Sequence, residues 1–154
     1  LDPVNWNIQY FIGRAHAQLL DHENAITFLQ YSISNGVSPS EPVRRLLAKE
    51  AEITGNVPLQ LEQLQALAKA ETATLDDVKL YAQVALASGN AQQAADTVRA
   101  AVNKWPMEAS ARELLGRVLA AGGNKVDALS AFEEAIRLDP LRKTALEKEM
   151  KEVR

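Results

Sequence analysis

The chain repeats itself about every 34 residues. Residues 12–15 (Ile-Gly-Arg-Ala) recur as residues 115–118 (Leu-Gly-Arg-Val), roughly three periods later, and Pro106 and Pro140 lie one period apart. A fixed period of this length is the signature of a repeat architecture, in which each unit is one small supersecondary structure. The chain is therefore predicted to be an array of similar units.

Each repeat unit reads as two helices joined by a short turn. Apolar residues recur with helical spacing on both sides of the turn, and 25 Ala and 20 Leu against 17 Val and Ile favour helices over strands. An all-α fold is predicted. The first helices are expected at residues 6–19, 41–54, 75–88 and 109–121, and the second helices at residues 23–35, 57–70, 92–104 and 126–138.

Small residues stand where two packed helices need them. The pairs Gly55-Asn56, Gly89-Asn90 and Gly123-Asn124 suit a turn, because glycine ends a helix in the left-handed conformation and asparagine begins the next one. The eighth place of every unit is also small, which predicts that the two helices of a unit cross closely there. The residues at this place are Gly13, Ala48, Ala82 and Gly116.

On these residues the chain resembles the tetratricopeptide repeat family. The last unit matches the family pattern best, with Gly116, Phe132 and Pro140 in place, and the second unit departs most, with Gln60 where a small residue belongs. The resemblance covers residues 6–140 and implies a right-handed α-α superhelix of four helical hairpins in one domain, 1–154. The hairpins would span about residues 6–40, 41–74, 75–108 and 109–140.

Residues 141–154 are expected to form a charged capping helix. Its apolar residues would cover one side of the last hairpin; they are Leu141, Ala145, Leu146, Met150 and Val153. No comparable cap stands at the front, where Leu1-Asp2-Pro3 repeats residues 138–140. We therefore expect the chain to be a fragment of a longer protein with further repeats or domains upstream.

The resemblance also implies where a partner binds, because the first helices of the family line a concave groove. Basic groups recur at the fifth and ninth places of the units, which favours an acidic, extended peptide. The alternative is a solvated helix face with local ion pairs, such as Glu41 with Arg45 and Lys49 with Glu52. The ninth places hold no Asn, which argues against the family's clamp for a C-terminal carboxylate. The candidate partner-binding residues are Asn7, Tyr10, Arg14, Gln18, Arg45, Lys49, Lys79, Gln83, Glu113 and Arg117.

Catalytic chemistry is not predicted from these residues. The chain has no Cys, and His16 and His22 are too far apart to share one helix face as metal ligands. The adjacent carboxylates Asp76-Asp77 and Glu133-Glu134 point to different sides of a helix, and residues 122–125 lack the strand and glycine spacing of a phosphate loop. We expect no catalytic residue, no metal and no cofactor.

The predicted function is a non-enzymatic scaffold that binds a peptide or partner protein in the groove. The net charge of −3 argues against nucleic-acid binding, and the short apolar stretches argue against membrane insertion. Alanine-rich units with Gly-Asn turns have a bacterial style, so we expect a bacterial assembly machinery in the cytoplasm or periplasm. The alternative is a regulatory or oligomerisation domain of a larger enzyme or membrane-associated protein, with self-association of the chain.

Overall fold

A computed structural model describes residues 6–154, and their regular elements are all helices. None of these helices combines the length and the hydropathy that a membrane crossing requires. The chain divides into two compact units, the first ending at Ala70 and the second spanning Glu71–Arg154. The elements are α1 (Trp6–Gln18), α2 (His22–Ser34), α3 (Glu41–Ile53), α4 (Val57–Lys69), α5 (Leu75–Ala87), α6 (Ala91–Lys104), α7 (Ala109–Ala121), α8 (Lys125–Leu138), the 3₁₀ turn η1 (Pro140–Arg142) and α9 (Lys143–Val153).

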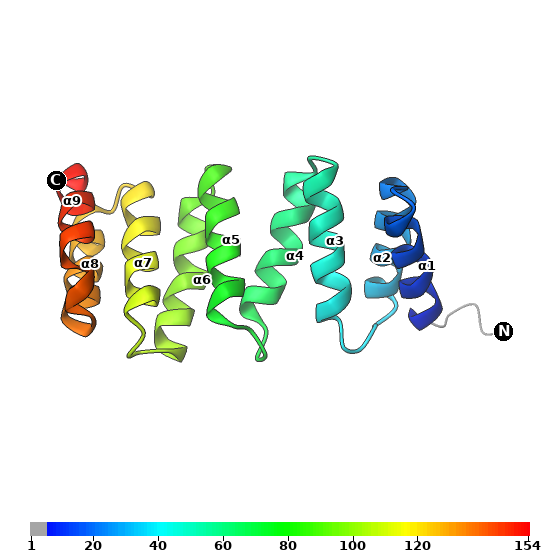
Figure 1. Cartoon of the computed structure of the whole chain (residues 1–154), viewed down its shortest axis with the longest axis horizontal. Coiled ribbons are helices and arrows are strands. Elements are labelled where there is room, and N and C mark those ends of the chain that lie inside the picture. Colours follow the sequence, from blue (N-terminus) through cyan, green and yellow to red (C-terminus); the bar gives the residue numbers. More distant parts are fainter. Residues whose placement is uncertain (1–5) are drawn as a thin grey trace. The chain divides into compact units, whose positions relative to one another are not determined.

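The first unit holds α1 to α4, in which each helix packs on the next (Figure 1). Its core is a cluster of buried apolar side chains against which Tyr10 and Ile26 also pack. Burial of these side chains is the main stabilising contribution, since each fully buried Leu or Val contributes about 1.5–3 kcal/mol before entropy is counted. The cluster consists of Leu29, Val37, Val43, Leu47, Ala51 and Leu59.

The second unit holds α5 to α9, again with each helix packed on the next and with α5 also in contact with α7 (Figure 1). Tyr81 and Phe132 are its largest fully buried side chains. Lys104, in the last turn of α6, donates hydrogen bonds to the carbonyls of Glu71 (2.8 Å) and Ala73 (3.0 Å). This cation therefore holds the segment that leads into α5.

The glycines at the eighth place are sites of close helix approach. A β-carbon on Gly116 would lie 2.6 Å from the buried ring of Phe132, and one on Gly13 would lie 2.9 Å from Leu29 Cγ. Real β-carbons do not come this close to other atoms. The first and second helices of these hairpins can therefore pack as they do only without a side chain at this place.

The turn between the two helices of a hairpin contains one residue in the left-handed conformation. Gly55, Gly89 and Gly123 have φ of 69°, 78° and 80°, and Leu20 takes the same place in the first hairpin with φ of 60°. Leucine is strained in this region. Packing of α1 on α2 imposes the turn geometry even where the sequence offers no glycine.

The C-terminal segment differs in part from the expected capping helix. The expectation is wrong for Leu141, which is 94% exposed, and for Ala145, which is also exposed, whereas Leu146 and Met150 are buried. The physical reason is the helix register. Leu141 lies in the 3₁₀ turn before α9, and Leu146 and Met150, four residues apart, form the stripe that faces the core.

Candidate functional site

The candidate residues of the first unit lie on α1 and α3. Tyr10 is half-buried and packs against the core, while the others are exposed on the helix surfaces: Asn7, Arg14, Gln18, Arg45 and Lys49. Within residues 6–154, Arg14 and Lys49 make no ion pair. The pair of Lys49 with Glu52, which the alternative interpretation predicted, is therefore not formed there.

In the second unit, candidate residues from two successive first helices line one open pocket of about 330 Å³. Lys79 comes from α5, and Glu113 and Arg117 come from α7. Gln83 is exposed on α5 and is not among the lining residues. We call this the Arg117 pocket; its lining residues are Lys79, Ser110, Glu113, Leu114, Arg117 and Arg142.

Arg117 is held by two carboxylates. Glu149 of α9 accepts two hydrogen bonds from its guanidinium, from Nε at 2.9 Å and from Nη2 at 2.8 Å. Glu113, one turn earlier on α7, lies 2.7 Å from Nη2. The contact with Glu149 is the paired, planar geometry in which arginine binds a carboxylate most strongly.

Arg142 also lines the Arg117 pocket. Its guanidinium pairs with Glu113 and with Asp139 at 2.9 Å, and it donates a hydrogen bond to Ser110 Oγ at 3.0 Å. Glu113 thus bridges two guanidinium groups, and its side chain is only 14% exposed. The turn η1, which carries Arg142, is in this way fastened to α7.

These ion pairs shift the titration of the groups that form them. The hydrogen bond from Arg117 lowers the pKa of Glu149, and the same bond raises the pKa of Arg117. The hydrogen bond with Glu113 likewise raises the pKa of Arg142. Lys79 pairs with Asp76 at 3.3 Å. Every cation of the pocket therefore already has a carboxylate beside it, and an acidic ligand must exchange with one of them.

Arg142, which lines the pocket, and Glu149, which pairs with Arg117, are charged residues that are not among the sequence-predicted candidates. The family pattern assigns ligand contacts to the first helices, and the sequence predicts only a capping role for residues 141–154. The charges of this segment are visible in the sequence. Which of them reach α7, however, depends on how α9 packs on α8, and the repeat pattern does not specify that packing.

The two histidines bind carboxylates of the first unit. Nδ1 of His16 lies 2.9 Å from Asp21, and Nδ1 of His22 lies 2.6 Å from Glu50, which is 3% exposed. A hydrogen bond from Asn24 is the main reason that the pKa of Asp21 is lowered. Among residues 6–154, no three metal-ligating side chains cluster. His16 thus links α1 to the turn before α2, and His22 links the two hairpins of this unit. The sequence did not predict these carboxylate partners.

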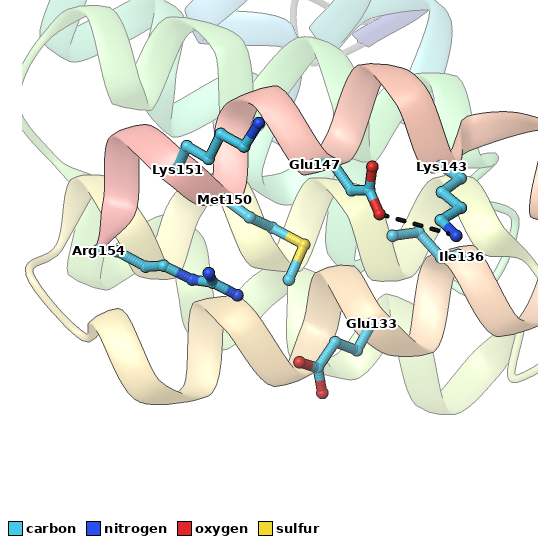
Figure 2. A pocket seen from close by; sticks show the side chains of 7 residues that line it. All are labelled: Glu133, Ile136, Lys143, Glu147, Met150, Lys151 and Arg154. Atoms are coloured by element: carbon cyan, nitrogen blue, oxygen red, sulfur yellow. Dashed lines mark ion pairs between the residues drawn. The ribbon is translucent and has the colours of Figure 1, made fainter.

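A second pocket of about 440 Å³ lies between α8 and α9 (Figure 2). It mixes acidic and basic side chains, with an ion pair between Lys143 and Glu147 at 3.8 Å. It contains none of the candidate residues. The lining residues are Glu133, Ile136, Lys143, Glu147, Met150, Lys151 and Arg154.

Comparison with known proteins gives a consistent result. A family model described as tetratricopeptide repeat matches residues 80–142, and no curated protein sequence matches the chain significantly. The structure of YrrB, described as a TPR protein with an unusual peptide-binding site, has a TM-score of 0.62 at 18% identity and covers 96% of this chain and 76% of its own. A MamA structure has a TM-score of 0.60 at 16% identity, covering 93% of this chain and 78% of its own.

A third neighbour is residues 41 to the end of MamA from Desulfovibrio magneticus RS-1. Its TM-score is 0.58 at 15% identity, and the match covers 96% of this chain and 92% of that one. At these low sequence identities, the similarity between this chain and the three structures is a similarity of fold alone. What these proteins share with the chain is an all-helical arrangement of successive hairpins.

Proposed function

We propose that this chain, in which residues 80–142 match a tetratricopeptide repeat model and the fold consists of successive helical hairpins, is a non-enzymatic scaffold that binds an extended segment of a partner protein. The all-α fold of helical hairpins that the repeat spacing predicts is confirmed, and the resemblance to the family is confirmed over residues 80–142. The proposed contact surface is the set of first helices. Its residues are Asn7, Tyr10, Arg14, Gln18, Arg45 and Lys49 in the first unit and Lys79, Gln83, Glu113 and Arg117 in the second.

The Arg117 pocket is the observation that carries this proposal. It is open and has a volume of about 330 Å³. It is lined by residues from α5 and α7, which are first helices of successive hairpins. Its charged side chains converge on one open place, where they can bind oppositely charged groups of a partner segment, and Leu114 adds an apolar contact.

Cations supply the chemistry that the partner must match. Lys79, Arg117 and Arg142 line the pocket with Glu113 as the one acid among the lining residues, and Arg14 and Lys49 are exposed on first helices of the other unit. Ammonium and guanidinium groups bind carboxylates. We therefore propose a partner segment that carries Asp or Glu side chains. The description of YrrB as peptide-binding supports a peptide as the class of ligand.

Reversing charges on first helices tests the proposal. The double variant Lys49→Glu/Lys79→Glu replaces one exposed cation in each unit, and we expect its affinity for an acidic peptide to fall about tenfold or more at low salt. The measurement is fluorescence anisotropy with a labelled peptide of alternating Glu and Gly. A far-UV circular dichroism spectrum like that of the parent would exclude unfolding as the cause.

The matched control is Lys69→Glu/Lys125→Glu, which makes the same change of net charge at exposed lysines of the second helices α4 and α8. We expect this control to lose much less affinity. Equal losses for the two double variants would mean that only the overall charge matters, and the first-helix surface would then have no special role.

One observation favours a second candidate, an oligomerisation or regulatory domain. The third place of the unit is buried in α3 and α7, where Val43 and Ala111 are 1% and 0% exposed. In α1, by contrast, Ile8 at this place is 38% exposed, and Phe11, one helical turn later, is 59% exposed. An apolar helix face of this kind is typical of a packing surface. A mass that rises with protein concentration in sedimentation equilibrium would favour this candidate. From the alanine-rich units and their Gly-Asn turns we propose a bacterial assembly machinery as the setting.

A further inference from the structure

The carboxylate of Glu149 binds the Arg117 guanidinium in the way that a carboxylate of a bound partner would. Arg117 is at the ninth place of its hairpin, on the proposed contact surface, and its Nε and Nη2 both donate to the Glu149 carboxylate at 2.9 and 2.8 Å. The donor and acceptor come from α7 and α9, 32 residues apart in the chain. The ninth places of the first unit differ, since Arg14 and Lys49 make no ion pair within the described residues.

The contact with Glu149 is separate from the packing that holds α9 in place. Leu146 and Met150 are buried in a cluster with Phe132 and Ala135 of α8, and Val153 packs against the same cluster. Glu149 lies beside this stripe, and its side chain is 32% exposed. The carboxylate can therefore leave the guanidinium by side-chain rotation while α9 stays on α8.

We propose that the Arg117 guanidinium is a carboxylate subsite of the partner-binding surface and that Glu149 occupies this subsite while no partner is bound. The inference rests on the proposed function and adds to it the place and the mechanism of acid recognition. A Glu or Asp side chain of the partner takes the position of the Glu149 carboxylate. Glu113 remains beside Arg117 in both states, because it lies on α7 itself and is also held by Arg142.

Exchange of one carboxylate for another has a definite energetic consequence. The number of guanidinium–carboxylate contacts is the same before and after binding, so the net gain from this subsite is small while Glu149 competes. Removing the Glu149 charge removes the competitor. Partly exposed ion pairs make modest contributions, and we therefore expect about a three- to fivefold increase in affinity.

The test is the variant Glu149→Gln, which keeps the size of the side chain and removes its charge. The probe is the labelled peptide of alternating Glu and Gly, measured by anisotropy at low salt. The matched control is Glu152→Gln, which removes one exposed acid from the same helix. We expect tighter binding for Glu149→Gln than for Glu152→Gln, and we expect the difference to vanish when both are made in an Arg117→Gln background.

The results separate the inference from the proposed function. If Arg117→Gln weakens binding but Glu149→Gln behaves like Glu152→Gln, the subsite exists and Glu149 does not compete for it, so the inference is overturned while the function stands. Equal affinity of Glu149→Gln and the double variant Arg117→Gln/Glu149→Gln would overturn the subsite, because the competitor is absent from both proteins. If the peptide binds to none of the variants, the acidic partner is wrong, and the proposed function and the inference fall together.

Discussion

At the scale of single residues, the helix crossing in the last hairpin depends on Gly116. The ring of Phe132, 1% exposed, occupies the space that a β-carbon would need. An aromatic ring in a packed core has no flexible end that could move aside, so the two helices must separate or the ring must leave its rotamer. The repeat of small residues at this place follows from this geometry.

We predict that Gly116→Ala destabilises the protein. Alanine is the better helix former by about 1 kcal/mol, but overpacking typically costs about 1–3 kcal/mol, and a contact of 2.6 Å with a rigid ring lies at the severe end. The net loss should be about 1–2 kcal/mol in urea unfolding. The control is Gly122→Ala, whose β-carbon would meet its nearest neighbour at an ordinary 3.4 Å. If both variants melt like the parent, the proposed crossing is wrong.

Residue-level prediction from the sequence succeeded where a local rule applies. The glycines of the turns and of the crossings follow from backbone conformation and from space, and both are local. The bond of His22 to the buried Glu50 joins residues 28 apart, and no spacing rule predicts it. The positive φ of Leu20 could not be predicted from its residue type, because leucine disfavours this conformation and the packing of α1 on α2 imposes it.

At the scale of elements, the helix bounds agree with the sequence prediction within one residue for α1 to α8. Turn residues provide this accuracy, since Asn56 and Asn124 accept hydrogen bonds from the first turns of α4 and α8. The start of α9 is less well predicted. Pro140 begins a 3₁₀ turn that delays the helix to Lys143 and moves Leu141 out to solvent.

The attachment of α9 to α7 should depend on pH through Glu149. Its pKa is lowered from 4.5 by the hydrogen bond from Arg117. The ion pair therefore contributes stability above pH 4.5, and this contribution is lost as the pH falls from there through the lowered pKa of the folded state. We predict that the difference in unfolding free energy between the parent and Glu149→Gln is largest near neutral pH and shrinks below pH 4.5.

Urea unfolding at a series of pH values measures this difference. Every other carboxylate is common to the two proteins, so the comparison isolates Glu149. A difference that stays constant down to the acid limit of the folded state would mean that the bond with Arg117 does not contribute to stability.

At the scale of the whole molecule, the sequence predicted a continuous array, and the structure describes two compact units with a core in each. The ten candidate residues were predicted from the family pattern, and three of them, Lys79, Glu113 and Arg117, meet in one pocket. The other charged groups that contact these residues, Arg142 and Glu149, come from η1 and α9. These lie outside the repeat, so their positions follow only from tertiary packing.

The binding surface itself can be mapped most directly by an NMR titration. ¹H–¹⁵N spectra recorded while the alternating Glu-Gly peptide is added report on every backbone amide and on the Arg117 Nε–H group. We predict shift changes along α5 and α7 and at Arg117, and along α1 and α3, with α6 and α8 little affected. Changes confined to second helices or to the pocket between α8 and α9, or no changes at saturating peptide, would contradict binding through the first helices.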